Sequence, residues 1–231
     1  MKKTNFYISN PILDTQITDI KLKIRLSMNG VVSDQMKTAG IEYKKNYGVT
    51  IPVIRDIAKT YAADADLANR LWMLGIRETM ILATLLYPTD KLTLENAKKY
   101  ILELDKMELV EQMSMNLLNK LPYANSLCIW CVNSPELWVR ITGLMLSVRI
   151  YENLNQAETS IIIDKSFEFS QTNEYYLYKA IALSLSRICR KNKETAQTIL
   201  DRMNNEFDTN NTGQQYISNE LKAEIEFLEA K

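Results

Sequence analysis

The sequence predicts an all-α protein in which pairs of helices stack into a solenoid. The chain of 231 residues holds only six glycines and five prolines, and its apolar residues recur at the spacing of an α-helix. Segments that begin with a polar residue and continue as an apolar run recur about every 30–40 residues, a period typical of two-helix repeats. Because stacked repeats of this kind curve, we expect an α-α superhelix with a concave cleft.

Composition limits the chemistry that the chain can perform. Its 28 basic and 28 acidic residues cancel, so it lacks the overall positive charge of many nucleic-acid-binding proteins, although a basic face balanced by acidic surface elsewhere is compatible with this sum. The chain contains no histidine and therefore has no histidine metal ligand or general base. Three cysteines, an odd number, favour a reducing compartment over a disulfide scaffold. We expect a cytoplasmic protein with no metal and no cofactor.

The sequence predicts no membrane segment. Residues 1–6 hold no long apolar run of the kind found in signal peptides. No apolar stretch approaches the length needed to span a bilayer. We therefore expect no membrane partner, and the sequence leaves the oligomeric state and any protein partner open. The chain is long enough to bury an ample core, and we expect residues 1–231 to form a single domain.

The first part of the chain predicts two helices. A short lead-in at 1–10 precedes a helix over 13–28, whose apolar residues form one face before an Asn-Gly pair ends it. A short helix follows over 31–38 and is closed by a glycine. The segment 41–47 then carries two adjacent lysines.

The stretch from 46 to 87 predicts three short helices joined by tight turns. Asp64 or Asp66 caps the second helix, and Gly75 ends it. The third helix is apolar nearly all round over 80–86. A helix that is apolar on every side must be covered by other elements, so we expect it to be buried between neighbouring layers.

The remainder of the chain predicts a further series of helices separated by prolines and polar turns. A polar loop over 208–216 precedes the last helix, which is amphipathic. The expected helices cover 93–104, 106–121, 125–132, 135–151, 155–169, 173–190, 194–207 and 218–230.

Charged residues recur near the start of each expected inner helix. These residues are Arg77, Glu111, Arg140 and Lys179, and an apolar run follows each of them. Equivalent positions of a solenoid line one continuous surface, so the pattern predicts a binding surface along the concave face. The alternative is that helix starts are simply polar.

Two motifs in the stretch from 46 to 87 resemble the alkylpurine DNA glycosylases built from HEAT-like repeats, the AlkD-like or DNA alkylation repair family. The run from Tyr47 to Arg55 reads YGVTIPVIR, and Trp72 is followed by Arg77-Glu78 and an apolar helix. The resemblance extends more loosely over roughly residues 20–200. It implies a HEAT-like repeat fold, binding to double-stranded DNA and excision of purines alkylated at N3 or N7.

The resemblance also implies that Glu111 is the catalytic residue. As an N-glycosidic bond breaks, positive charge builds on the sugar, and a fixed carboxylate can stabilise that charge and orient a water molecule. A purine alkylated at N3 or N7 is already cationic, so it leaves without a general acid. The alternative is that Glu111 is an ordinary solvated helix residue.

Two departures from the family favour other functions. Met107 and Leu183 stand at the positions where the family has tryptophans that hold the nucleotide. Their presence favours a non-catalytic binder of damaged or branched DNA as an alternative to a DNA glycosylase. A HEAT-type protein–protein scaffold is a second alternative, which the zero net charge favours slightly.

Several basic residues are candidates for contacts with DNA phosphates. The segment around Arg140 resembles the family segment whose arginine binds the DNA backbone, and such contacts position a duplex without reading its sequence. An ion pair between helices is the alternative role for Arg140, and a pair with Glu78 or Glu108 is the alternative for Arg77. Cations near a helix end also complement the helix dipole. The candidates are Arg140, Arg77, Lys179, Arg187, Lys44 and Lys45.

Cys128 and Cys131 have the C-x-x-C spacing of redox and zinc sites. They fall in a predicted helix with no βαβ context and no other metal-type ligands nearby, so we do not expect a redox or zinc site. The sequence also holds no Gly-rich phosphate loop, nucleophile elbow or metal triad.

Overall fold

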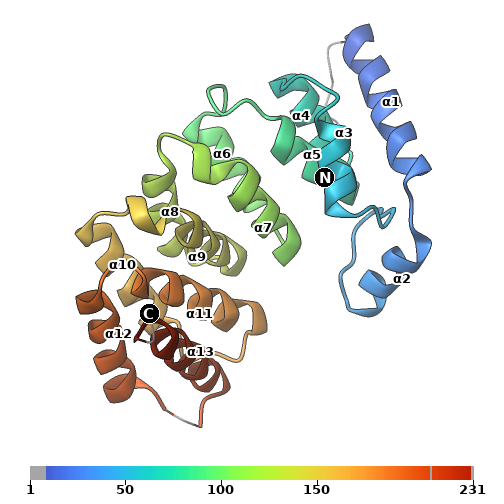
Figure 1. Cartoon of the computed structure of the whole chain (residues 1–231). Coiled ribbons are helices and arrows are strands. Elements are labelled where there is room, and N and C mark those ends of the chain that lie inside the picture. The colour runs from blue at the N-terminus through green and yellow to red at the C-terminus, as the bar shows by residue number, and fades with distance from the viewer. Residues whose placement is uncertain (1–8, 209, 230–231) are drawn as a thin grey trace. The chain divides into compact units, whose positions relative to one another are not determined.

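The computed structural model describes residues 9–208 and 210–229, and every extended regular element in those residues is a helix (Figure 1). A single parallel bridge, between Lys45 and Ile76, is the one β-type pairing in that part of the chain. The predicted all-α class is therefore confirmed. Most of the expected lead-in falls on residues 1–8, which lie outside the described residues.

The chain divides into two compact units, the first running to Lys91 and the second starting at Leu92. That the whole chain forms a single domain stays a prediction. The helices of the first unit are α1 (Pro11–Leu26), α2 (Gly30–Thr38), α3 (Ile51–Ala58), α4 (Ala65–Met73) and α5 (Arg77–Leu86). Those of the second unit are α6 (Leu94–Leu102), α7 (Met107–Asn116), the 3₁₀ helix η1 (Leu118–Lys120), α8 (Ala124–Val132), α9 (Leu137–Ile150), the 3₁₀ helix η2 (Tyr151–Asn153), α10 (Gln156–Glu168), α11 (Tyr175–Cys189), α12 (Lys193–Glu206) and α13 (Thr212–Glu229).

Local signals in the first unit act as the sequence predicts. The side chain of Asp64 accepts a hydrogen bond from the backbone N–H of Leu67, so Asp64 rather than Asp66 caps α4. Gly75 follows α4 with a φ of +63°, in the left-handed region that favours glycine at a helix end. Helix α5 is buried on nearly all sides, as its uniform apolar sequence requires.

A buried carboxylate fastens α5 to the segment before α3. Glu78 is 0% exposed, and its oxygens accept hydrogen bonds from the backbone N–H groups of Tyr47 (3.1 and 3.2 Å) and Val49 (3.2 Å). Nη1 of Arg77 donates to Oε1 of Glu78 at 3.1 Å and to the carbonyl oxygen of Val49 at 2.8 Å. Buried charges are tolerated only when they are paired and hydrogen-bonded, and this cluster meets both conditions.

The start of α2 depends on the same segment. Gly48 has a φ of +69°, and a Cβ atom there would overlap the carbonyl oxygen of Asn29. The N–H of Asn29 donates to the carbonyl oxygen of Tyr47 at 2.8 Å. Glu78 therefore positions a loop that in turn holds the start of α2, so one carboxylate connects three parts of the first unit.

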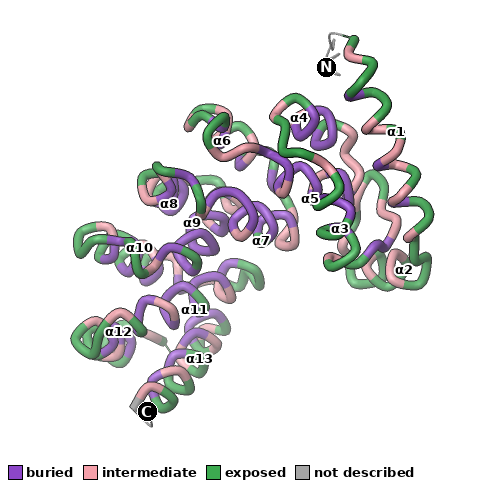
Figure 2. Tube along the Cα trace, turned by 45° about the horizontal axis from the view of Figure 1, so that its top comes forward, coloured by how far each residue is buried: buried purple, intermediate pink, exposed green. Residues whose placement is uncertain are grey.

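The second unit has two layers of helices. The inner helices α7, α9, α11 and α13 contact one another in that order, and α8, α10 and α12 lie on their other side (Figure 1). Figure 2 shows α9 and the middle of α11 almost wholly buried, whereas α12 exposes one side. The apolar core of this unit therefore lies between the layers, and one side of the inner layer is left facing outward.

Small residues allow α9 to approach both α8 and α11 closely. A Cβ atom on Gly143 of α9 would lie 2.7 Å from both Cβ of Cys131 and the backbone nitrogen of Val132 in α8. The buried hydroxyls of Ser147 on α9 and Ser184 on α11 share a hydrogen bond of 2.6 Å. These contacts fix the register of the three central helices.

The C-terminal helix begins earlier than predicted. The expected loop over 208–216 is shorter, because α13 starts at Thr212. The side chain of Asn211 accepts a hydrogen bond from the N–H of Gln214, and Gly213 packs so closely on Thr172 that no side chain fits between them. The polar residues that suggested a loop therefore include one that caps the start of α13.

We predict that Glu78→Gln destabilises the first unit by about 2–4 kcal/mol, because the amide group would turn a donor toward backbone and guanidinium donors. The measurement is urea denaturation followed by circular dichroism. The matched control is Asp56→Asn, which removes a carboxylate from an exposed pair with Lys59 (2.7 Å) and is expected to change stability by less than about 0.5 kcal/mol. Equal effects of the two substitutions would contradict this account of Glu78.

Candidate nucleic-acid interface

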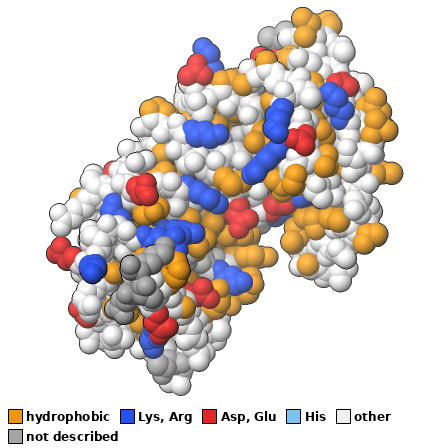
Figure 3. All heavy atoms as spheres, viewed as in Figure 1, with side chains coloured by type: hydrophobic (Ala, Val, Ile, Leu, Met, Phe, Trp, Pro, Cys, Tyr) orange, Lys and Arg blue, Asp and Glu red, His pale blue; other side chains and the backbone are white. Residues whose placement is uncertain are grey.

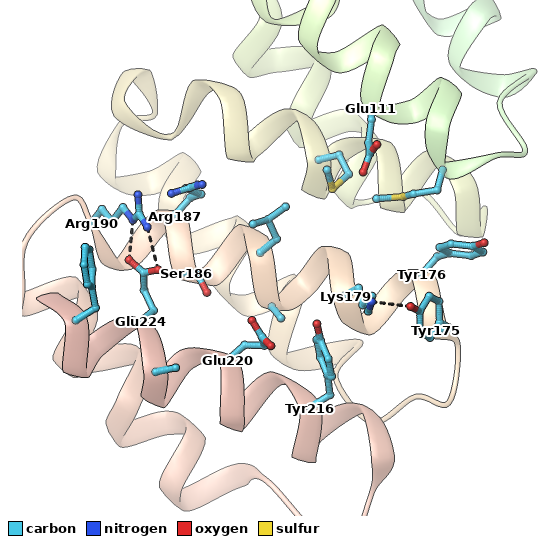
Figure 4. A pocket seen from close by; sticks show the side chains of 16 residues that line it. Glu111, Tyr175, Tyr176, Lys179, Ser186, Arg187, Arg190, Tyr216, Glu220 and Glu224 are labelled. Atoms are coloured by element: carbon cyan, nitrogen blue, oxygen red, sulfur yellow. Dashed lines mark hydrogen bonds and ion pairs between the residues drawn. The ribbon is translucent and has the colours of Figure 1, made fainter. Parts of the chain in front are cut away.

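A groove runs along the outward-facing side of the inner helices of the second unit. It has a volume of about 570 Å³ and takes its lining from α7, α9, α11 and α13 (Figure 4). Its apolar floor includes Met107, Met145 and Leu183, and its polar residues come mainly from α11 and α13. Side chains that are far apart in the sequence thus meet on one surface, as expected for equivalent positions of stacked repeats.

The groove brings together three of the predicted site residues. Glu111 of α7 and both Lys179 and Arg187 of α11 line it, as do the two positions at which tryptophans were missing, Met107 and Leu183. The site residues Arg140, Arg77, Lys44 and Lys45 do not line this groove.

Glu111 points from α7 toward the groove (Figure 4). The residue is exposed, and within the described part of the chain its carboxylate makes no hydrogen bond and no ion pair. Partial enclosure by the groove raises the pKa of this carboxyl above its ordinary value, and the nearby Glu108 raises it further, whereas Arg149 opposes the shift. Glu111 is therefore a carboxylate that the folded chain accommodates without a partner.

Lys179 is held in place by an aromatic ring. Its Nζ donates a hydrogen bond to the hydroxyl of Tyr175 at 2.6 Å and lies 4.4 Å from the centroid of that ring and 5.7 Å from the ring of Tyr216. The hydrogen bond with Tyr175 raises the pKa of Lys179, so the ammonium stays charged at neutral pH. Figure 4 shows this pair at one end of the groove.

Tyrosines gather at this end of the groove, and none of them is among the site residues predicted from the sequence. Ring centroids lie 5.3 Å apart for Tyr175 and Tyr176, 5.7 Å apart for Tyr175 and Tyr178, and 5.1 Å apart for Tyr178 and Tyr216. Trp138 continues the series, 5.5 Å from Tyr176. We call the four tyrosines the tyrosine platform. The run of three tyrosines within four residues, at 175–178, is the signal in the sequence that could have predicted it.

The charges of the groove are balanced. Its lining holds the basic residues Lys179, Arg187 and Arg190 and the acidic residues Glu111, Glu220 and Glu224. Arg190 is bound by Glu224 through two hydrogen bonds of 2.7 and 2.9 Å, whereas Arg187 makes no hydrogen bond or ion pair within the described residues. On the face shown in Figure 3, basic and acidic side chains are likewise interspersed with apolar ones.

Arg140 lies elsewhere in the second unit. Its Nε and Nη2 donate to the carbonyl oxygen of Ser134 at 3.3 Å, and Nη2 also donates to that of Pro135 at 3.1 Å. The guanidinium stacks 3.7 Å from the ring centroid of Phe169, and burial lowers its pKa from the ordinary value. The geometry assigns Arg140 to holding the turn between α8 and α9, with part of its donor capacity already used.

Arg77 must be removed from the set of DNA contacts. It is 4% exposed, and its guanidinium binds Glu78 and the carbonyl oxygen of Val49 inside the first unit. A phosphate cannot reach a group enclosed in this way. Of the alternatives considered for Arg77, pairing with Glu78 is the one that the structure contains.

Lys44 and Lys45 are exposed residues of the first unit. With Lys37 and Ser33 they line a separate polar depression, and Nζ of Lys45 lies 4.8 Å from the ring centroid of Tyr47. A hydrogen bond from Lys45 lowers the pKa of the Tyr47 hydroxyl. A role of these lysines in DNA binding stays a prediction.

The cysteines of the C-x-x-C sequence are buried in α8 and free. Burial raises the pKa of Cys131 to about 12, so its thiolate, the reactive form, is not populated at neutral pH. The described residues contain no group of three or more Cys, Asp or Glu side chains arranged to hold a metal ion.

Membrane-spanning helices combine a length of about 20 residues with a predominantly apolar sequence. None of the helices in the described part of the chain has both properties to the extent needed to cross a bilayer.

The fold and the groove define a HEAT-like helical-repeat protein, and comparison with known proteins gives its family. Residues 25–213 match the model of the DNA alkylation repair enzyme family, so the chain belongs to that family. A solved structure described as a new family of proteins related to the HEAT-like repeat DNA glycosylases, with affinity for branched DNA structures, has a TM-score of 0.74 with this chain. The two share 12% identity over 89% of this chain and 94% of that one, which confirms the predicted HEAT-like fold. No curated protein matches the chain.

We predict that Glu111→Gln slightly stabilises the protein at neutral pH, by less than about 0.5 kcal/mol because the residue is exposed. A raised carboxyl pKa means that the folded state binds the proton more tightly than the unfolded state, so wild-type stability falls as pH rises through the pKa range. The amide removes this cost, and the advantage should vanish at acidic pH, where Glu111 is protonated.

The measurement is thermal unfolding of wild type and variant at neutral and acidic pH. Glu226→Gln, an exposed change on α13 outside the groove, is the control and is expected to show no such dependence. A variant less stable than wild type at neutral pH would contradict the assigned environment of Glu111.

Proposed function

We propose that this protein binds DNA at branched or damaged sites through the groove of its second unit. The observation that carries the proposal is the position of Lys179 beside exposed tyrosine rings, with a second cation, Arg187, further along the same groove. Membership of the DNA alkylation repair enzyme family supports it, as does the likeness to a protein described as having affinity for branched DNA structures.

Phosphate contacts in this proposal come from Lys179 and Arg187. Arg187 has no protein partner among the described residues, so its guanidinium is available to bind phosphate oxygens through two parallel hydrogen bonds. The ammonium of Lys179 is oriented by Tyr175 and keeps its charge. Arg190 is a weaker candidate, because Glu224 already occupies it.

Base excision is the finer form of the proposal, with Glu111 as the catalytic residue. In this reaction the bond between C1′ and the purine nitrogen breaks, and its electron pair neutralises the cationic alkylated base. The carboxylate of Glu111 stabilises the positive sugar, a water oxygen attacks C1′, and the water proton passes to the carboxylate. The raised pKa of Glu111 suits it to accept that proton.

The lining of the groove also favours a second function. Three acidic and three basic residues alternate with apolar side chains, and such a mixed surface suits a peptide as well as a nucleic acid. A protein–protein scaffold is therefore the second candidate. The two candidates differ in their response to phosphate-contact substitutions and to salt, because phosphate binding releases counterions.

We predict that the double variant Lys179→Ala/Arg187→Ala binds a four-way DNA junction at least about tenfold more weakly than wild type, since two charged hydrogen-bond donors are lost. The slope of log affinity against log salt should fall by about two, because each phosphate contact contributes close to 0.9. Fluorescence anisotropy at several salt concentrations measures both quantities.

A charge-matched control is Lys193→Ala/Lys222→Ala. Both lysines are exposed and lie outside the groove, on α12 and α13. We expect this variant to bind within twofold of wild type. Equal losses in the two double variants would mean that DNA is attracted by general charge rather than by this groove, and a wild type without DNA affinity would favour the scaffold.

We predict that single-turnover release of N7-methylguanine or N3-methyladenine from duplex DNA, if it occurs, collapses in Glu111→Gln. The amide retains the size of the side chain but cannot stabilise a sugar cation or accept a proton. Release that is equal in wild type and variant would exclude Glu111 as the catalytic residue. No release by a wild type that still binds DNA would leave the non-catalytic form of the proposal.

A further inference from the structure

We infer that the tyrosine platform binds an unpaired base at the branch of the DNA by stacking, an inference that rests on the proposed function. The observation that carries it is the exposure of two adjacent rings. Tyr175 is 51% exposed and Tyr176 is 38% exposed, although both rings contact other aromatic side chains. Large aromatic groups of this kind normally bury more of their surface, so they offer area to a ligand.

The rings are fixed rather than free. Tyr175 is held through its hydroxyl by Lys179 and through ring contacts with Tyr176 and Tyr178. Tyr176 also packs against Trp138, which lies in the first turn of α9. Because the rings are already ordered, a ligand that stacks on them loses little conformational freedom of the protein, which favours binding.

The angle between the rings of Tyr175 and Tyr176 limits how many bases can stack on them. The planes of Tyr175 and Tyr176 are inclined at 80°, in an edge-to-face arrangement. Because the two planes are nearly perpendicular, both rings cannot stack on the same base. A base that lies on the face of Tyr176 therefore has the neighbouring ring at its edge, which suits a single base better than a continuous stack.

The charge of the groove favours unpaired bases over a paired duplex. With equal numbers of basic and acidic side chains, the lining offers little net attraction to the dense phosphates of a double helix. In a duplex the base faces are covered by neighbouring pairs, and only ends, flaps and branch points expose them. Aromatic side chains bind exposed bases with little regard to sequence, because every base has a π-face.

Lys179 lies where stacking of a base and binding of its phosphate can occur together. Its ammonium lies within 4.4 Å of the Tyr175 ring centroid, so a nucleotide stacked on the platform would bring its own phosphate close to this cation. Arg187 lies two helical turns further along α11 in the same groove, where the next part of the backbone can be bound. The platform and the cations thus form one site for a short single-stranded segment.

The test compares a paired duplex with the same duplex carrying a short unpaired flap. Tyr176→Leu, which keeps apolar volume but removes the ring, is expected to lower affinity for the flap DNA about tenfold and to leave duplex affinity within twofold. Tyr176→Phe is the matched control and should behave as wild type, because the Tyr176 hydroxyl makes no hydrogen bond within the described residues. The ratio of flap to duplex affinity should also fall as salt rises, because the flap adds phosphate contacts with Lys179 and Arg187.

A direct readout uses 2-aminopurine as the unpaired base, whose fluorescence changes on stacking. Wild type and Tyr176→Phe should quench it, and Tyr176→Leu should not. A wild type that binds DNA, but with a flap-to-duplex ratio and quenching unchanged in Tyr176→Leu, would overturn the platform while leaving DNA binding intact. A wild type that binds neither DNA would overturn the proposed function together with the platform.

Discussion

Close packing of the inner helices is the constraint on which the groove depends. In the second unit α9 approaches α8 so closely that Gly143 has no space for a side chain, and it meets α11 through the shared hydrogen bond of Ser147 and Ser184. Helices held at such short distances cannot slide without losing buried contacts. The residues on the opposite side of α11, Lys179 and Arg187 among them, are therefore carried by a helix whose register is fixed.

The features that the sequence predicts well are local. The helical class, the capping by Asp64 and the end at Gly75 depend on residues within a turn of one another, and the structure contains all of them. Of the four positions expected to share one surface, Glu111 and Lys179 line the same groove, whereas Arg77 and Arg140 do not. The earlier start of α13 was not predicted, since its first turn looks like a polar loop until the cap by Asn211 is known.

The features that the sequence misses depend on which side of a helix meets a partner. Arg77 has the charge of a phosphate contact, but its neighbour Glu78 and a distant carbonyl oxygen enclose it. The tyrosines at 175–178 are conspicuous in the sequence, yet their grouping with Trp138 and Tyr216 arises only when α9, α11 and α13 come together. Charge and aromaticity are readable from residues, whereas the burial of a charged side chain and the assembly of rings across helices are not.

The residues of the first unit that carry the resemblance to the family have a structural role. The matching residues in the first unit, Gly48 and the pair Arg77-Glu78, build a buried joint between α5, α2 and the segment before α3. Their presence follows from the fold and carries no information about DNA. The groove of the second unit instead holds the residues that can act on a ligand: an unpartnered carboxylate, two cations and exposed rings. A chain without net charge can bind nucleic acid through such a site, because stacking needs ordered rings and exposed bases rather than a positive surface.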